Sequence, residues 1–313
     1  MIIKAYSDTH YLEALNNLIQ RLSINNPQRK ELIDEYMRIN AGDIGEKFIM
    51  ETIEKLQLPY DFFIFHNLSL FIESKIQIDI LIITKYYVII LEVKNIKGAI
   101  EFSQNPKQLI RTLPNGEMHV FNSPEPQLDE YIYQIKQFFL NYGIDIPIYG
   151  AIVFPFTSSF IRQPTEKTII LRKNELKPFL RNIPTGKEYL NDKNVEFFNS
   201  YFLKDQLTFN PYPLIEKYKI QRDEVMNGVI CPNCGTLGMK RFAFYWFCQS
   251  CGHKSTNAHE NAIYDYLKII NNTITNRECR RFLEVNNKDQ VNKMLRKMPL
   301  NKTGNYRNTK YTL

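Results

Sequence analysis

The architecture of this chain follows from two neighbouring stretches, Gln77-Ile78-Asp79-Ile80-Leu81-Ile82-Ile83 and Tyr87-Val88-Ile89-Ile90-Leu91-Glu92-Val93-Lys94. Both hold consecutive isoleucine, leucine and valine residues, which is typical of strands buried on both faces of a sheet. Three charged residues interrupt them: Asp79, Glu92 and Lys94. Alternate side chains of a strand share a face, so Glu92 and Lys94 should point the same way, about 6–7 Å apart. If the two strands pair across the short turn between them, Asp79 comes close to Glu92.

These charged residues indicate a metal site. Two carboxylates at the end of a sheet form the hard-oxygen environment that Mg²⁺ prefers. A metal held there can polarise a phosphate oxygen and activate a water molecule. A lysine beside it can balance the charge that develops on the phosphate, so the group suits a phosphodiesterase. Taken alone, the same residues also fit a simpler alternative, in which strand-end salt bridges neutralise the acids.

The surrounding residues predict a domain of mixed helices and strands. Leucines recur at helical spacing near the N-terminus, and a second helix leads through Gly42–Glu46 to about Leu56. Residues 128–141 also have the helical period. Further strands are predicted at Phe62–Phe65, Gly98–Phe102, Tyr149–Phe154 and Thr168–Leu171. The order of helix, three strands, helix and strand indicates a mixed α/β or α+β fold.

Four short motifs follow one another along residues 38–155. They are Gly42-x-x-Gly45-Glu46, Gln77-Ile78-Asp79, Glu92-Val93-Lys94-Asn95-x-x-Gly98 and Pro124-x-x-Gln127. In order and spacing they resemble the nuclease-related domain family, which belongs to the PD-(D/E)xK, restriction-endonuclease-like group. The resemblance implies a core of αβββαβ type and a metal-dependent nuclease.

The resemblance also implies a role for each motif residue. Asp79 and Glu92 would be the ligands of Mg²⁺ or Mn²⁺, and Lys94 would be the catalytic lysine. Glu46 would be a third acid acting through a metal-bound water, and Gln127 would hydrogen-bond to substrate or water. The chain departs from the family at Ser123-Pro124, where Asn-Pro is usual, and this bears on Gln127 more than on the acids.

Two C-x-x-C pairs predict a zinc ribbon. Cys231 and Cys234 are separated from Cys248 and Cys251 by 13 residues, a spacing that suits one closed, structural Zn²⁺ site with four thiolates. Two unrelated reduced pairs or a redox site are the alternative. Between the pairs, Phe242, Phe244 and Trp246 alternate along a predicted hairpin. We expect them to form the core of this small domain; stacking on exposed bases is the other interpretation.

The last sixty residues are basic. Residues 254–313 contain 12 Lys and Arg against 5 Asp and Glu, which accounts for the whole formal charge of +7. Thr275–Leu283 and Lys288–Met298 predict two short helices joined by a polar turn, and the residues after them predict a wing hairpin. The segment resembles a winged helix-turn-helix; a helical cap with a solvated basic face is the alternative. The candidate nucleic-acid contacts are Arg277, Arg280, Arg281, Lys288, Lys293, Arg296 and Lys297.

The composition excludes several other classes of protein. Hydrophobic residues make up 44% and charged residues 23% of the 313 residues, unlike a disordered, collagen-like or coiled-coil chain. Neither a transmembrane run nor an N-terminal secretory signal is found, so we expect a cytoplasmic protein without a membrane partner. Phosphate-loop, HExxH and GxSxG motifs are absent, which leaves an ATPase motor, a protease or an esterase without support.

These features predict four segments and one function. The segments are a helical arm at 1–37, a nuclease-related domain at 38–226, a zinc ribbon at 227–256 and a basic winged helix-turn-helix-like module at 257–313. The expected function is a Mg²⁺-dependent endodeoxyribonuclease that the last two segments place on DNA. A non-catalytic DNA-binding or regulatory protein with a nuclease-like scaffold is the alternative, and an RNA-directed enzyme is a third. A homodimer is left open.

Overall fold

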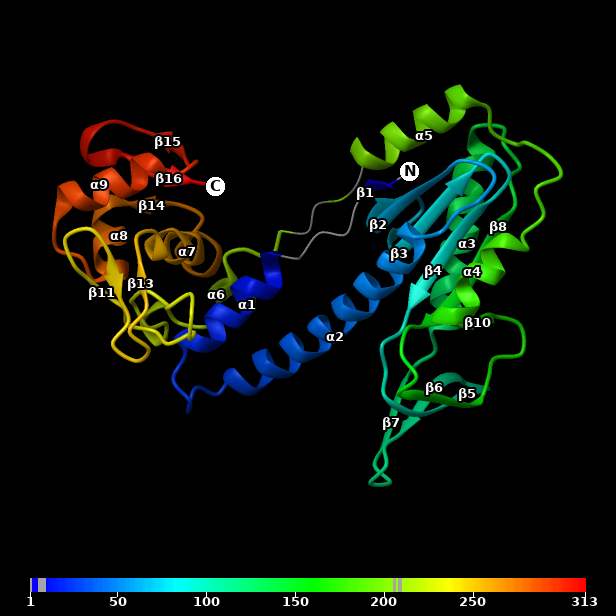
Figure 1. Ribbon diagram of the computed structural model, residues 1–313, viewed down its shortest axis with the longest axis horizontal. Helices are drawn as coiled ribbons and strands as arrows, with labels where there is room; N and C mark the ends of the chain where they lie inside the picture. Colours follow the sequence, from blue (N-terminus) through cyan, green and yellow to red (C-terminus); the bar gives the residue numbers. More distant parts are fainter. Residues whose placement is uncertain (1, 5–9, 205–206, 208–209) are drawn as a thin grey trace. The chain divides into compact units, whose positions relative to one another are not determined.

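The computed structural model describes residues 2–4, 10–204, 207 and 210–313 (Figure 1). The chain divides into two compact units, and each unit is assembled from two separate pieces of sequence. Unit 1 consists of Met1–Asp8 and Asn40–Thr208, and unit 2 consists of Thr9–Ile39 and Phe209–Leu313. None of the helices in the described ranges combines the length and the apolar character needed to cross a membrane.

A six-stranded sheet forms the centre of unit 1. Its strand order is β1-β2-β3-β4-β8-β10. Strands β2, β3 and β4 pair antiparallel, whereas β4, β8 and β10 run parallel. Every residue of β4 is buried, as the apolar run predicted. The bounds are β1 (Ile2–Lys4), β2 (Phe62–Phe71), β3 (Lys75–Thr84), β4 (Val88–Val93), β8 (Ile148–Phe154) and β10 (Ile169–Arg172).

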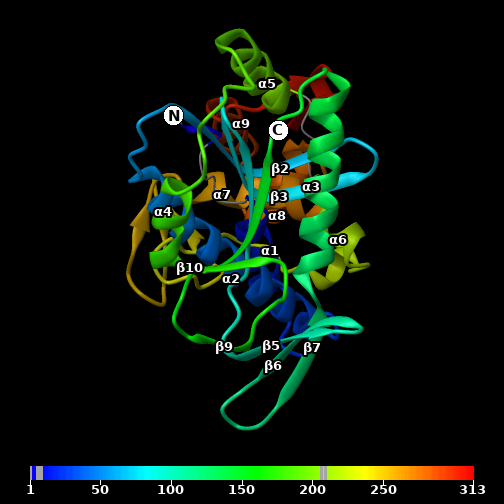
Figure 2. The same ribbon diagram turned by 90° about the vertical axis from the view of Figure 1, so that its right-hand side faces the viewer.

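Helices cover both faces of this sheet. Figure 2 shows α3 along one side of the sheet and α4 along the other. Apolar residues of α3 and α5 pack with Val88 and Ile90 of β4, while those of α2 and α4 pack with Ile89 and Leu91. The bounds are α2 (Arg29–Glu54), α3 (Pro124–Asn141), α4 (Lys173–Arg181) and α5 (Asp192–Lys204). The order α2-β2-β3-β4-α3-β8 confirms the predicted αβββαβ core.

A second sheet interrupts this core between β4 and α3. Its strand order is β7-β6-β5-β9, with β5 (Gly98–Gln104), β6 (Lys107–Thr112), β7 (Met118–Asn122) and β9 (Ser159–Gln163). Gly98 opens β5 with a φ of 111°, and a Cβ there would lie 2.7 Å from the carbonyl oxygen of Thr112. Only glycine fits this close approach of the backbone.

Unit 2 contains the four cysteines and a winged helix. A three-stranded sheet of β11 (Lys240–Arg241), β12 (Trp246–Phe247) and β13 (Lys254–Ser255) carries the cysteine loops. Helix α7 (Ala258–Asp265) continues into a π-helical turn, Tyr266–Ile270. The next elements are β14 (Ile274–Thr275), α8 (Asn276–Leu283), α9 (Lys288–Lys297), β15 (Asn301–Thr303) and β16 (Lys310–Thr312). The sheet order β14-β16-β15 places β15 and β16 as the wing, as predicted.

One hydrophobic core joins all parts of unit 2. Leu18 of α1 (His10–Arg21), Leu32 of α2, Trp246 of the ribbon and Leu295 of α9 belong to the same buried cluster. Helix α6 (Leu214–Lys217) also contributes to it. The predicted segments 1–37, 227–256 and 257–313 therefore supply residues to a single core, because the apolar face of α1 needs a partner and finds it here.

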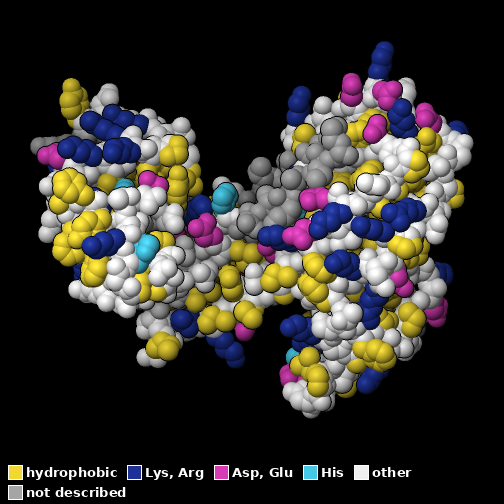
Figure 3. Space-filling view, viewed as in Figure 1, with side chains coloured by type: hydrophobic (Ala, Val, Ile, Leu, Met, Phe, Trp, Pro, Cys, Tyr) yellow, Lys and Arg dark blue, Asp and Glu magenta, His cyan; other side chains and the backbone are white. Residues whose placement is uncertain are grey.

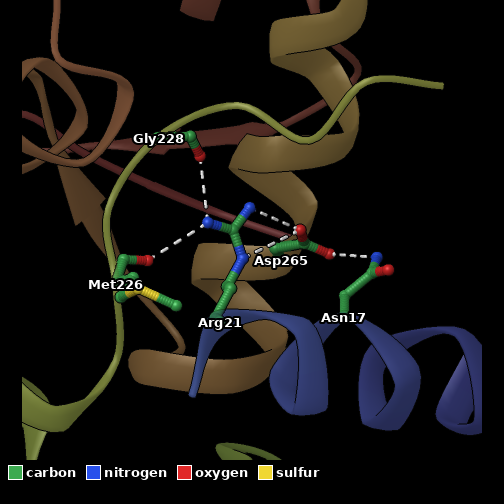
Figure 4. A network of polar contacts seen from close by, with 5 residues as sticks. All are labelled: Asn17, Arg21, Met226, Gly228 and Asp265. Carbon is green, nitrogen blue, oxygen red and sulfur yellow. Dashed lines mark hydrogen bonds and ion pairs between the residues drawn. The ribbon is translucent and has the colours of Figure 1, made fainter. Parts of the chain in front are cut away.

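A buried ion pair accompanies this core (Figure 4). The side chain of Arg21 is fully buried, and its Nη2 lies 2.8 Å from Oδ2 of Asp265 in α7. Nη1 of Arg21 donates to the carbonyl of Gly228 at 2.9 Å, and Asn17 donates to the other oxygen of Asp265 at 2.8 Å. The pair thus connects α1 to the winged helix and to the segment that leads into the ribbon.

Candidate active site and metal centre

The pairing of β3 with β4 ends beside Asp79. The backbone ladder runs from Ile83–Val88 to Ile80–Leu91. One residue further, Oδ2 of Asp79 accepts a hydrogen bond of 2.8 Å from the backbone N–H of Val93. At this point the N–H of β4 is bonded by the Asp79 side chain and not by a backbone carbonyl of β3. This hydrogen bond fixes the carboxyl group of Asp79 at the end of β4.

Glu92 and Lys94 form an ion pair at the same end of the sheet. Glu92 is 1% exposed, and its Oε1 lies 2.5 Å from Nζ of Lys94. Its second oxygen, Oε2, is buried and has no hydrogen-bond partner in the part of the chain that the structure describes. Val93 packs in the cluster that contains α2 and α4, so the alternation of the strand directs Glu92 to the side of α3.

Glu46 approaches from α2, which the glycine motif holds against β4. A Cβ at Gly45 would lie 2.9 Å from Cβ of Asn95 and 3.5 Å from Cγ1 of Val93. Nδ2 of Asn95 donates to the carbonyl of Ala41 at 2.7 Å. The Gly-x-x-Gly-Glu and Glu-x-Lys-Asn motifs are therefore in direct contact, and this contact brings Glu46 to the strand end.

The three acids influence one another electrostatically. Burial raises the pKa of Glu46 to about 7, with further contributions from Asp43 and Glu92. Burial, followed by the charges of Glu92 and Glu46, raises the pKa of Asp79 well above its usual value. Burial alone would lower the pKa of Lys94, but the carboxylates of Glu92 and Asp79 outweigh it, so that pKa is raised. The site concentrates negative charge that a cation would offset.

The donor set fits Mg²⁺. Asp79 and Glu92 supply hard oxygen donors, and Oε2 of Glu92 is a buried oxygen without another partner in the described residues. Within those residues, no third His, Cys, Asp or Glu joins them in a three-ligand group. Two carboxylates suffice for Mg²⁺, because this ion usually keeps several water ligands in its octahedral shell.

Gln127 lies on the first turn of α3. Ser123 caps this helix: its Oγ accepts from the backbone N–H of Glu125 at 3.3 Å. Serine and asparagine are both good N-caps, so the departure from Asn-Pro preserves the start of the helix. Nε2 of Gln127 donates to the hydroxyl of Tyr131 at 3.1 Å, and Tyr131 lies within electrostatic range of Lys94. Gln127 therefore contacts Tyr131, and among the described residues no hydrogen bond joins it to Asp79, Glu92 or Lys94.

One comparison with known families covers this part of the chain. Residues 41–155 match the family model of the nuclease-related domain. This match implies a restriction-endonuclease-like fold, and the matched segment contains Glu46, Asp79, Glu92, Lys94 and Gln127. No match was found among curated proteins or among solved structures.

The matched segment also contains a histidine, His66, that was not among the predicted site residues. Nε2 of His66 lies 2.8 Å from Oε2 of Glu46, and His66 is 1% exposed. Burial lowers the pKa of His66 to about 4, with a contribution from Lys4, so its imidazole is neutral at pH 7. His66 is therefore a hydrogen-bonding partner that orients Glu46. A polar residue inside the apolar strand Phe62–Phe71 was the available signal.

Outside the matched segment, the four cysteines Cys231, Cys234, Cys248 and Cys251 form a cluster that could hold a metal ion. Their sulfur atoms lie within 4.8 Å of one another. The Sγ atoms of Cys231 and Cys251 are 3.7 Å apart, and those of Cys234 and Cys248 are 3.6 Å apart. A tetrahedral site with Zn–S bonds of about 2.3 Å requires sulfurs about 3.8 Å apart, so the cluster fits one Zn²⁺.

The basic candidates lie on α8 and α9. Arg277, Arg281, Lys288, Lys293, Arg296 and Lys297 are exposed. Arg280 is half-buried, and its Nη1 donates to the carbonyl of Asn286 at 3.3 Å, so it stabilises the turn between the helices. The inner face of α9 is formed by Val291, Met294 and Leu295. Figure 3 shows lysine and arginine side chains gathered where Figure 1 draws α9 and β15.

Proposed function

We propose that the chain is a Mg²⁺- or Mn²⁺-dependent endodeoxyribonuclease that hydrolyses phosphodiester bonds at Asp79, Glu92 and Lys94. The observation that carries the proposal is that the two oxygens of the buried Glu92 carboxylate have different surroundings. Oε1 of Glu92 is paired with Lys94 at 2.5 Å, while Oε2 is buried without a partner in the described residues. The match of residues 41–155 to the nuclease-related domain supports it.

Each residue has a distinct task in this proposal. Asp79 and Glu92 hold the metal, and when bound it polarises the phosphate and lowers the pKa of a water molecule. Lys94 provides a compact positive charge for the phosphate oxygens. Glu46, oriented by His66, accepts a hydrogen bond from the attacking water. Gln127 and Tyr131 border the site on the side of α3.

Unit 2 would place the enzyme on DNA. The exposed lysines and arginines of α9 suit contacts with phosphates, as in other winged helices. The structural Zn²⁺ would stabilise the ribbon, whose Ala243 carbonyl accepts a hydrogen bond from Gln290 of α9. A cluster of free thiols also supports a cytoplasmic location, because thiolate metal sites persist where the environment is reducing.

Cleavage of plasmid DNA tests this function. Wild-type protein should nick and linearise a plasmid with Mg²⁺ or Mn²⁺, and the Glu92→Gln variant should not. The exposed Glu196 of α5 provides a matched control, and Glu196→Gln should cleave like wild type. Binding without cleavage, under every divalent metal, would instead favour a non-catalytic DNA-binding protein.

A further inference from the structure

Two aromatic side chains are exposed at the tip of the ribbon hairpin. The hairpin closes where the N–H of Phe242 donates to the carbonyl of Tyr245 at 2.9 Å. Phe244 is 84% exposed and Phe242 is 49% exposed, whereas Trp246 is fully buried. The expectation of an aromatic core therefore holds for Trp246 but is wrong for Phe242 and Phe244. The rings of Phe242 and Tyr245 are stacked with centroids 5.4 Å apart.

The hairpin tip is held beside the N-terminal end of α9. Nε2 of Gln290 donates to the carbonyl of Ala243 at 3.2 Å. Lys240 pairs with Glu284 at 3.2 Å, next to the turn between α8 and α9. At the base of the hairpin, Nε1 of Trp246 donates to Nδ1 of His259 in α7 at 3.2 Å. These contacts fix the tip relative to the winged helix.

The tip and the basic surface of α9 face the same way. Figure 3 shows a hydrophobic patch where Figure 1 draws β11, next to the lysine and arginine side chains over α9 and β15. The exposed side of α9 includes Lys293, Arg296 and Lys297. A partner that covers both areas must offer flat apolar faces beside a high density of negative charge.

Unpaired nucleotides next to a duplex have this chemistry. Inside a duplex the base faces are stacked on one another, and only the base edges are open to a protein. Unpaired bases expose both faces and stack on aromatic side chains. A duplex held by α9 would end or branch at the hairpin tip.

We propose that Phe242 and Phe244 stack on unpaired bases beside the duplex bound by α9, so that the substrate class is DNA with a junction between double-stranded and single-stranded parts. This inference rests on the proposed DNA-binding function. It narrows the substrate from continuous duplex to overhangs, flaps and forks.

Binding of the full chain to matched oligonucleotides tests the inference. The probes are one blunt duplex and the same duplex with a short single-stranded flap, both measured in Ca²⁺ by fluorescence anisotropy. Wild type should bind the flap substrate about tenfold more tightly, as expected for stacking of one or two bases. Phe244→Ala should lose this preference and keep its affinity for blunt duplex, and Phe244→Trp should retain it.

Matched variants separate the possible failures. Phe71 of unit 1 is 65% exposed, and Phe71→Ala should bind both probes like wild type. A 2-aminopurine at the first unpaired position should be quenched by wild type and not by Phe244→Ala. Equal binding of both probes by wild type and Phe244→Ala overturns the inference while leaving DNA binding intact. No binding to either probe overturns the proposed function itself. If wild type shows no preference for the flap and forms a dimer that Phe244→Ala dissociates, the inference is wrong and the hairpin tip is a contact with a second copy of the chain.

Discussion

Glu92 forms an ion pair with the partly exposed Lys94 through one carboxylate oxygen, while its other oxygen is buried without a hydrogen-bond partner in the described residues. The pair has a separation of 2.5 Å, and the side chain of Glu92 is only 2% exposed. Burying a carboxylate with an unsatisfied oxygen is unfavourable, so a fold that needed only stability would satisfy or replace it. The pair is therefore better explained by metal binding than by a strand-end salt bridge.

Substitutions at this pair should separate catalysis from DNA binding. Asp79→Asn and Glu92→Gln should each lower the cleavage rate by about 10²–10³, the usual cost of losing one preorganised electrostatic group. Affinity for DNA, measured in Ca²⁺, should change by no more than a few-fold because in the proposed function unit 2 supplies the contacts. Lys94→Arg should also be inactive, since a planar guanidinium cannot replace a compact ammonium. If Asp79→Asn cleaves like wild type, the catalytic metal is not bound at Asp79.

The charge of α9 should appear in the salt dependence of DNA binding. Deleting residues 254–313 would also remove much of the core of unit 2, so a point variant is the cleaner test. Lys293→Ala should reduce the slope of log K against log salt by about 0.9, for one lost phosphate contact. The matched control is Lys193→Ala on α5, another exposed lysine. Equal slopes for the two variants would argue against α9 as the DNA contact.

The sequence predicted the parts of the fold that have local patterns. Apolar runs predicted β3 and β4, and Asp79 and Glu92 were recognisable as the acidic residues within these runs. The spacing of the cysteines predicted the Cys₄ cluster. Strands β6 and β7 were missed because they are short and only one of their residues, Leu109, is buried. The Asn115-Gly116 pair between them was a hairpin signal that could have revealed both.

Features that depend on distant partners could not be predicted. His66 of β2 contacts Glu46 of α2, and the sequence around one residue does not indicate the other as its partner. Arg21 and Asp265 are 244 residues apart in sequence, so the leucine spacing of α1 predicted a helix but not its place in unit 2. Hydrophobic periodicity describes which face of an element is buried, and it does not describe against what.

One Zn²⁺ per chain should be found by elemental analysis. Removing it with a strong chelator should unfold the ribbon, because metal binding supplies much of the folding free energy of such sites. Trp246 is the single tryptophan of the chain, so its fluorescence reports on this event. Cys231→Ser should reproduce the change without chelator. The secondary structure of unit 1 should persist, and protein purified without bound zinc yet fully folded would refute the assignment.

Breaking the buried ion pair between Arg21 and Asp265 should destabilise unit 2 strongly. Arg21→Met leaves Asp265 buried without its partner, which should lower the free energy of unfolding by about 3–5 kcal/mol. Urea unfolding followed by Trp246 fluorescence measures the effect. Lys240→Met provides the control: its pair with Glu284 is about half-exposed, so its loss should cost less than about 1 kcal/mol. Similar costs for both variants would show that α1 is not an integral part of this core.

The stability of unit 2 should decrease as the pH falls below about 6.5, because of His259. Nδ1 of His259 accepts a hydrogen bond from Trp246, which requires a neutral ring, and His259 is 7% exposed. Burial, with contributions from Arg241 and Lys297, lowers its pKa to about 4. The unfolded chain takes up the proton near pH 6.5 and the folded chain only near pH 4, so between these values the unfolded state binds more protons. The stabilisation is complete above pH 6.5 and is lost progressively towards pH 4.

Urea unfolding at pH 7.5 and pH 5.5, followed by Trp246 fluorescence with zinc content verified at both, measures this loss. We expect about 1 kcal/mol less stability at pH 5.5 from this residue, given about 1.4 kcal/mol for each pH unit of one titrating group. In His259→Gln the amide oxygen can still accept from Trp246 but cannot be protonated, so this variant should lose that part of the pH dependence. A His259 ring whose NMR signals titrate near pH 6.5 in the folded protein would contradict the prediction, since the hydrogen bond to Trp246 would then not hold the ring neutral.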